Sequence, residues 1–109
     1  MTRSGSLTHT SALVLQAVAA GYRYGFDIIG VTGLPSGTVY PALRRLEDSG
    51  HVRSWWEREG AAHRDNRPPR KYYEVRPAGR KALAEAVRRF RHIGAIKPNP
   101  APALRPEKR

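Results

Sequence analysis

The sequence contains no cysteine, which excludes disulfide bonds, thiolate nucleophiles and thiolate zinc sites. This absence agrees with a reducing compartment such as the cytoplasm. Long apolar runs are also missing, since no stretch reaches the roughly 18 residues of a membrane span, and we expect no membrane partner. The apolar run near the N-terminus follows a single base, Arg3, and the polar residues Thr8 to Ser11, which is unlike a signal peptide. We expect a helix of the mature protein there.

Patterns that carry catalysis are scarce as well. No nucleophile elbow, HExxH motif, carboxylate pair or phosphate-cradling glycine loop occurs, so we expect no enzyme, no catalytic residues and no cofactor. The histidines are scattered, without an i,i+4 pair or a nearby carboxylate cluster, and we expect no metal site within the chain: His9, His51, His63 and His92. A metal site assembled across a dimer stays open.

Acidic residues are few. Nine Asp and Glu stand against 20 Lys and Arg, for a formal net charge of +11, which favours a polyanionic partner such as nucleic acid. The first 50 residues contain four basic and three acidic side chains, so the basic excess lies almost entirely after Gly50. Most of the basic residues are arginine, whose planar guanidinium suits two-pronged recognition of phosphate and guanine.

A mass of 12.2 kDa fits one domain, which we expect over residues 7–95. Residues 7–20 predict a helix that is apolar nearly all round, so we expect a second surface, another subunit, to cover part of it. A short apolar helix follows over residues 24–31 and ends at the sequence TGLP (32–35). Ser36 begins a third helix, which Gly50 closes. We expect Pro41 in or near its first turn, with the cap between Ser36 and Thr38.

The hydrophobic period becomes extended after Gly50. Residues 51–59 and 71–75 predict two strands of a β-hairpin, joined by a long basic loop, GAAHRDNRPPR. Pro77 begins a fourth helix with apolar residues on one face. Residues 96–109 are rich in proline, and we expect a disordered basic tail. The fold class is therefore mainly α with a small antiparallel β-hairpin.

This order of helix, helix, turn, helix, hairpin and helix is that of a winged helix-turn-helix domain. The third helix begins with small polar residues, as a recognition helix does when its N-terminal end approaches base edges and phosphates in the major groove. The basic hairpin suits a wing that lies along the DNA backbone or the minor groove.

Several strings resemble the PadR family of bacterial winged-helix transcriptional regulators. They are SGTVYPALRRLEDSGHV (36–52), YGFDII (24–29), and RPPRKYYEV followed by AG (67–75, 78–79). The resemblance spans about residues 13–90. It implies a cytoplasmic, nucleoid-associated homodimer that represses promoters at inverted-repeat operators and is relieved by a small effector. It also implies dimerisation through the first helix and a C-terminal helix, about residues 7–20 and 78–94.

Three departures qualify the resemblance. The usual His-Gly-Tyr before the second helix is Tyr24-Gly25-Phe26, so a hydroxyl at the third position is lost, and Tyr24 is the available substitute. The usual Leu-Thr after the hairpin is Val75-Arg76, which removes a threonine cap. The sequence ends soon after one C-terminal helix, as in the short branch of the family, so we expect no large separate effector domain.

The candidate site residues fall into four groups. Those expected to bind DNA through the recognition helix are Ser36, Gly37, Thr38, Tyr40, Pro41 and Arg44; those at the start of the second helix are Tyr24 and Gly25; those of the wing are Arg64, Arg67, Arg70 and Lys71. The expected dimer contacts are Leu13, Leu15, Val18, Leu83, Val87 and Phe90. The alternative for Tyr40 is a role in the core. The alternative for the arginines is a place on a solvated surface without a partner.

Neighbouring aromatic pairs mark both strands of the hairpin. Because successive side chains of a strand face opposite ways, we expect one Trp and one Tyr in the core and one of each outside. Sheet packing is the usual role of such an outward pair, with an effector contact as the other, for which the candidates are Trp55, Trp56 and Tyr73.

The leading hypothesis is a sequence-specific DNA-binding transcriptional regulator, a repressor acting as a homodimer. The alternative is a basic architectural or RNA-binding protein without operator choice, which would bind unrelated duplexes or RNA equally well. A third possibility is a dimeric ligand-binding module, which an aromatic compound would reveal by quenching tryptophan fluorescence.

Overall fold

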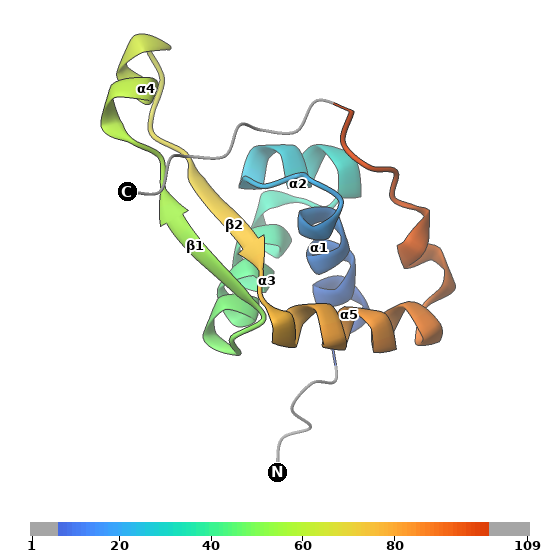
Figure 1. The fold of residues 1–109 in the computed structure, drawn as a ribbon. Coiled ribbons are helices and arrows are strands. Elements are labelled where there is room, and N and C mark those ends of the chain that lie inside the picture. Colours follow the sequence, from blue (N-terminus) through green and yellow to red (C-terminus); the bar gives the residue numbers. More distant parts are fainter. Residues whose placement is uncertain (1–6, 101–109) are drawn as a thin grey trace.

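Helix α1 (His9–Ala19) lies in the middle of the helical body of this computed structural model, which describes residues 7–100 (Figure 1). It begins where Thr8, in extended conformation, accepts a hydrogen bond at Oγ1 from the Ser11 N–H at 3.1 Å. Its apolar residues then recur on every side, as the sequence predicts.

Other elements of the same chain surround α1. The elements that pack against it are α2 (Gly25–Thr32), α3 (Ser36–Asp48), β2 (Lys71–Val75), α5 (Pro77–Arg89) and the 3₁₀ helix η1 (Arg91–Ala95). Leu15 and Ala17 are fully buried, and Val18 is nearly so. The chain itself thus covers most of α1, while Leu13 stays half-buried and Ala19 exposed, and cover of this remainder by a second subunit stays a prediction.

Helices α2 (Gly25–Thr32) and α3 (Ser36–Asp48) form the predicted helix-turn-helix. Gly33 ends α2 with a φ of 74°, and Gly50 follows α3 with a φ of 79°; side chains rarely adopt this left-handed conformation. The predicted cap of α3 is wrong by one residue or more, because Pro35 is the N-cap. Pro41 therefore lies in the second turn and removes the N–H that would bond the Gly37 carbonyl; Gly37 is exposed, so water can satisfy it.

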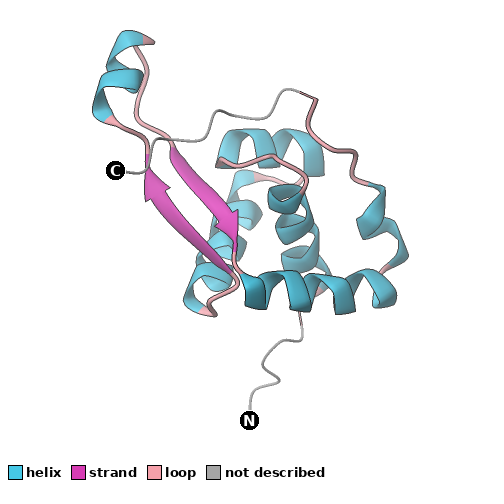
Figure 2. Cartoon of the chain, viewed as in Figure 1, coloured by secondary structure: helices cyan, strands magenta, loops and turns pink. Residues whose placement is uncertain are grey.

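Strands β1 (Val52–Trp56) and β2 (Lys71–Val75) form the predicted antiparallel hairpin (Figure 2). Val52 pairs with Val75, and Trp56 pairs with Lys71. The chain before α2 joins the free edge of β2: Tyr24 forms a β-bridge with Tyr72, and the Tyr73 N–H donates to the Arg23 carbonyl at 2.8 Å. No sequence pattern predicted this third extended segment beside the hairpin.

The segment between the strands is not a simple loop. Helix α4 (Glu59–Arg64) occupies part of it and stands at the far end of the hairpin (Figure 1). The expectation of a long basic loop is corrected accordingly. We call β1, β2 and the segment between them, residues 52–75, the wing.

The C-terminal part departs from prediction in two ways. Helix α5 (Pro77–Arg89) ends before Phe90, which adopts an extended conformation, and the 3₁₀ helix η1 (Arg91–Ala95) follows at a new angle. Residues 96–100 pack on the body instead of forming a free tail, because the backbone N–H of Asn99 donates to the Ala20 carbonyl at 2.8 Å. The rest of the predicted tail, residues 101–109, lies outside the described residues.

One core joins these elements. It is formed by side chains from α1, α2, α3, the wing, α5 and η1; the largest that are fully buried are Leu15, Ile28, Leu43, Leu46, Ile93, Val14, Val39 and Val52. Over residues 7–100, none of the helices has the length and apolar character needed to cross a bilayer.

Replacing Gly79 with alanine should destabilise the protein strongly. A Cβ at this position in α5 would overlap the backbone carbonyl of His51, which also accepts a hydrogen bond from the Arg76 N–H at 2.9 Å and is not free to move. We expect Gly79→Ala to lower the free energy of unfolding by about 2 kcal/mol, as overpacking does. Urea denaturation followed by circular dichroism measures this.

Gly30→Ala is the matched control. Gly30 lies within α2, is exposed, and has no neighbouring atom within 4 Å of the point that a Cβ would occupy. Alanine there should raise the free energy of unfolding by about 0.5–1 kcal/mol, because glycine is a poor helix former. Equal effects of the two substitutions would contradict the close packing of α5 on the loop before β1.

Candidate nucleic-acid interface

The outer side of α3 is polar, basic and open. Val39, Leu43 and Leu46 are fully or almost fully buried on the inner side, which fixes the rotation of the helix. The predicted recognition residues lie at its N-terminal end and on its outer side, and all except the half-buried Thr38 are exposed: Ser36, Gly37, Tyr40, Pro41 and Arg44. The first acidic residue that is fully exposed on α3 is Asp48, at its last position.

Tyr40 joins α3 to the start of α2. Its ring lies directly over Gly25, where any Cβ would overlap the Tyr40 ring and hydroxyl. The ring nevertheless stays 49% exposed. The pair therefore holds the two helices together while leaving the tyrosine accessible, so a packing role and a surface role coexist.

Tyr24 connects α2 to the wing. The Arg70 guanidinium lies 4.1 Å from the centroid of its ring, and the ring meets Tyr72 edge-on at 5.7 Å. Burial, followed by the nearby Asp27 carboxylate, raises the pKa of the Tyr24 hydroxyl. Asp27 also lies in the first turn of α2, where its charge competes with any phosphate at that helix end.

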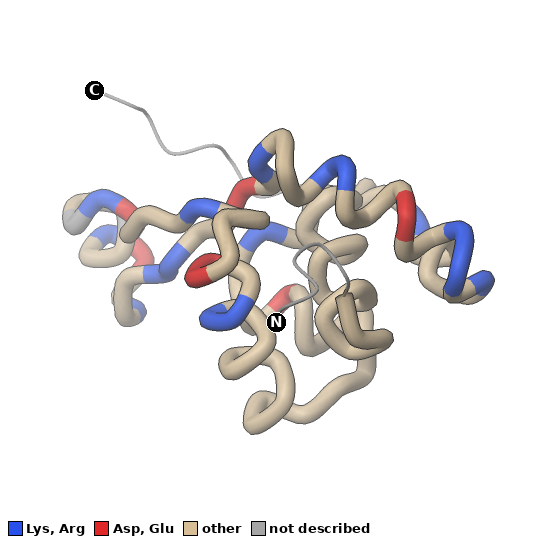
Figure 3. The backbone as a smooth tube through the Cα atoms, turned by 90° about the horizontal axis from the view of Figure 1, so that it is seen from below, with Lys and Arg blue, Asp and Glu red and all other residues tan. Residues whose placement is uncertain are grey.

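Basic residues are spread along the wing and α5 (Figure 3). Their like charges repel, and only a few acidic side chains lie among them. Basic side chains that are paired with acidic side chains of the same chain are therefore less available to bind a polyanion than the others.

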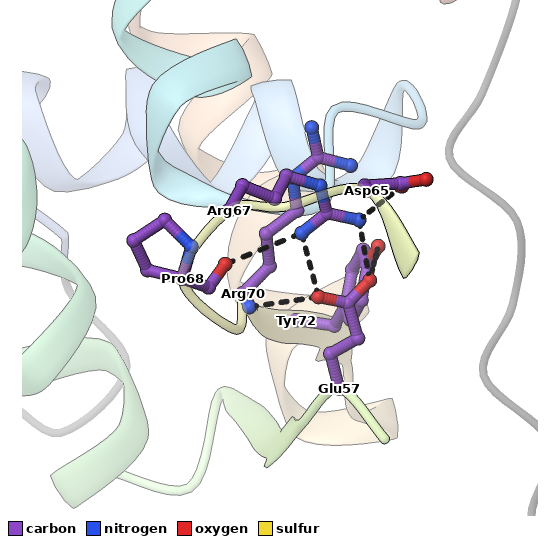
Figure 4. A network of polar contacts seen from close by, with 6 residues as sticks. All are labelled: Glu57, Asp65, Arg67, Pro68, Arg70 and Tyr72. Atoms are coloured by element: carbon purple, nitrogen blue, oxygen red, sulfur yellow. Dashed lines mark hydrogen bonds and ion pairs between the residues drawn. The ribbon is translucent and has the colours of Figure 1, made fainter. Parts of the chain in front are cut away.

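Glu57 is the main internal partner of the wing bases (Figure 4). Its carboxylate accepts hydrogen bonds from both terminal nitrogens of Arg67, at 2.7 and 2.8 Å, and from the backbone N–H of Arg70 at 3.0 Å. Its side chain is only 7% exposed, and the Arg67 hydrogen bonds lower the pKa of Glu57 to about 2. The carboxylate thus ties the end of β1 to the segment that leads into β2.

The four predicted wing bases differ in availability. Arg67 also pairs with Asp65 at 3.1 Å, so its charge is compensated twice. Arg70 is half-buried against Tyr24, and Lys71 lies 3.7 Å from Glu47 of α3. Arg64, at the end of α4, is exposed.

The aromatic pairs are arranged differently from prediction. Tyr72 and Tyr73 are 5% and 6% exposed, so neither tyrosine points outward. Tyr73 belongs to the core, and Tyr72 is covered by Tyr24 and Trp55 on the opposite face of the sheet. Trp55 is half-buried and Trp56 is 63% exposed, so the three suggested effector residues do not share one surface.

The predicted dimer residues also divide into two groups. Leu15, Val18 and Leu83 are buried inside the subunit and are unavailable to a partner. Val87 is 36% exposed, whereas Leu13 and Phe90 are half-buried.

Histidine, aspartate and glutamate side chains do not gather into a group of three or more anywhere in the described part of the chain.

Comparison with known proteins places this geometry in context. The model of the transcriptional regulator PadR-like family matches residues 14–85, which include α2, α3 and the whole wing. The chain belongs to the PadR-like family. The predicted resemblance is confirmed, and transcriptional regulation rather than catalysis is the family's activity.

Solved structures agree on the winged-helix fold. A PadR family transcription regulator from Clostridium difficile is 23% identical, with a TM-score of 0.66 over 82% of this chain and 94% of that one. A transcriptional regulator from Clostridium thermocellum is 22% identical, with a TM-score of 0.64 over 76% and 81% of the two chains. A PadR family regulator from Eggerthella lenta is 26% identical, with a TM-score of 0.57 over 73% and 72%. A search of curated proteins gave no match.

In this PadR-like chain no side chain takes the place of the missing threonine cap, and Pro77 starts the helix. Arg76 is the N-cap of α5 without a side-chain hydrogen bond, and Pro77 occupies the start of the helix, where its missing N–H is harmless.

Sequence reasoning missed Glu57. The available signal was an acidic residue at the end of a strand that leads into an arginine-rich segment, where a carboxylate relieves repulsion between cations. The pairing of Glu57 with Arg67, ten residues away, depends on α4 folding the segment back and was not visible in the spacing.

Glu57→Gln should destabilise the folded wing in a pH-dependent way. Because the folded-state pKa lies at about 2, below the ordinary 4.5, the carboxylate contributes stability above pH 4.5 and loses it as the pH falls toward 2. We expect the difference in unfolding free energy between wild type and Glu57→Gln, measured with urea, to be largest near neutral pH and to shrink over that range.

Glu85→Gln is the control, since Glu85 forms an exposed i,i+4 pair with Arg89 at 3.4 Å and surface pairs contribute little. A stability difference for Glu57→Gln that stays constant down to about pH 2 would contradict the role of the ionised carboxylate.

Proposed function

We propose that this chain is a homodimeric repressor that recognises an inverted-repeat operator. Helix α3 enters the major groove, and the wing lies on the neighbouring backbone or minor groove. The two half-sites lie about one helical turn of DNA apart, as the two-fold symmetry of a dimer requires.

The exposed side of α3 is the observation that carries this proposal. Small residues at its N-terminal end, Ser36 and Gly37, allow close approach to the DNA, and Arg44 projects from the same exposed side of the helix. Tyr40 is exposed and packed at once, which fixes its position for a phosphate or base contact. We assign sequence preference to Thr38 and Arg44.

The wing supplies sequence-independent attraction in this proposal. Arg64 is exposed and Arg70 and Lys71 lie at the surface of the hairpin, whereas Arg67 serves as a brace because Glu57 and Asp65 neutralise it. Gly25 and Tyr24 position α2 and Arg70 beside this surface.

Dimerisation through the α5 side of the subunit is part of the proposal. Val87 is exposed on α5 although it is apolar, and Leu13 and Phe90 are only half-buried. A small effector, repression and a cytoplasmic, nucleoid-associated location follow from the family resemblance and remain predictions, as does any contact of Trp55 with an effector.

The decisive experiment is a fluorescence-anisotropy competition. A labelled fragment of the protein's own promoter competes against random duplex at about 150 mM salt, where non-specific contacts are weak. We expect a preference of roughly a thousandfold or more for the operator-containing fragment. Equal binding of unrelated duplexes, of every fragment in a genomic pool, or of RNA would instead support the architectural or RNA-binding alternative.

Arg44→Ala should relax sequence discrimination. An arginine that binds a base edge in two places contributes about 1–3 kcal/mol of discrimination, so the preference for operator should fall about tenfold or more. Arg88→Ala is the matched control, because Arg88 is exposed near the end of α5 and changes the net charge equally. If the two variants lost the same affinity for all duplexes, Arg44 would act only through its charge.

Val87→Glu should dissociate the dimer. A charge buried at an apolar subunit interface is costly, so equilibrium sedimentation should show a mass that falls from twice 12.2 kDa to 12.2 kDa. Arg64→Ala changes the net charge by the same amount on the wing and should leave the mass unchanged. A dimer that persists in Val87→Glu at micromolar concentration would place the interface elsewhere.

A further inference from the structure

The position of Trp56 follows from strand alternation. Ser54 and Trp56 of β1 share one face of the hairpin, and their partners across the sheet are Tyr73 and Lys71. This face packs against α3, because the Ser54 hydroxyl donates to the Glu47 carboxylate of α3 at 2.6 Å. Trp56 therefore points to the same side of the sheet as the helix that carries the recognition residues.

The hairpin reaches beyond the cover that α3 provides. Tyr73, beside Ser54, is 6% exposed, whereas Trp56, two residues further along β1, is 63% exposed. Burial, followed by the charges of Glu47 and the nearby Tyr40, raises the pKa of the Tyr73 hydroxyl. Trp56 is thus the next side chain outward from Ser54 and Tyr73 on the sheet face that contacts α3.

One cationic group, the ammonium of Lys71, lies beside the exposed indole. The Lys71 ammonium lies 5.7 Å from the Trp56 ring centroid and 3.7 Å from the Glu47 carboxylate, which ties it between strand and helix. The wing beyond it carries more bases than acids. An apolar ring beside an ammonium suits a partner that combines negative charge with an apolar surface. The DNA minor groove offers both, because charged phosphates flank a groove lined by deoxyribose and base edges.

We propose that Trp56 is a DNA-contacting residue, whose indole packs against deoxyribose and base edges in the minor groove beside the major groove entered by α3. This proposal rests on the proposed function and assigns Trp56 to DNA instead of an effector. The ring contributes contact area without charge, while Lys71 beside it neutralises a phosphate.

Fluorescence of Trp56 itself provides the first test. Trp55 and Trp56 are the two tryptophans of the chain, so Trp55→Phe leaves Trp56 as the single reporter. The probe is a 30-base-pair random duplex at about 50 mM salt, because a backbone and minor-groove contact does not need the operator. We expect the emission of Trp55→Phe to be quenched by at least a third at saturation; unchanged emission at a concentration where anisotropy shows full binding would overturn the proposal.

Affinity and its salt dependence provide the second test. Trp56→Ala should weaken duplex binding about tenfold with an unchanged slope of log affinity against log salt, because an apolar contact releases no counterions. Lys71→Ala should lower that slope by about one unit. Trp56→Phe, which keeps the apolar ring and the fold, should retain most of the affinity. Wild-type affinity in Trp56→Ala would overturn the proposal.

These outcomes separate the proposal from the function on which it rests. If wild type prefers its operator and Arg44→Ala relaxes that preference while Trp56→Ala is silent, only the Trp56 contact fails. If wild type shows no operator preference, the proposed function fails whatever Trp56 does. A sedimentation mass halved by Trp56→Ala would place the ring in a subunit interface and overturn the DNA contact.

Discussion

The burial of most of α1 by the rest of the chain is the constraint on which the other elements depend. An apolar helix of 11 residues exposes too much surface to be stable alone, and in this small chain nearly every element is used to cover it. Helices α2 and α3 cover it together, so their mutual angle is set by contact with α1 as well as by the turn at Gly33. Helix α3 is consequently held mainly by the core, with Tyr40 on Gly25 and Glu47 at the wing as additional contacts, and Ser36, Gly37 and Arg44 stay exposed.

The same constraint shapes the C-terminal part of the chain. Helix α5 stops at Arg89, and η1 then turns so that Ile93 is fully buried against the core. Asn99 continues this path by hydrogen bonding to the backbone at the end of α1. The end of α5 at Arg89 thus coincides with the burial of Ile93, whose apolar side chain gains stability from the core.

Electrostatics dominates the outer part of the wing, residues 57–70, whereas Val52, Tyr73 and Val75 at its base belong to the core. One carboxylate, Glu57, organises the arginine-rich segment, while Glu47 of α3 accepts from Ser54 and pairs with Lys71. These two acidic residues fix the wing internally and relative to the recognition helix, respectively. Compensation of Arg67 inside the wing also means that a count of basic residues overstates the charge presented to a polyanion.

The sequence alone determined the order and type of the main elements, including the helix-turn-helix and the hairpin, and it indicated the family. The reason is that the hydrophobic period, the glycines that end helices and the Tyr40-Pro41 pair are local signals. The same local signals indicated that the N-terminal half of α3 and the basic hairpin are the functional elements. Tertiary structure alone decided that α1 is covered within the subunit, that Tyr72 and Tyr73 are both buried, and that Glu57 holds Arg67. Each of these features depends on contacts between segments ten or more residues apart in the sequence. No local sequence pattern encodes which side chains such a contact buries or which charges it neutralises.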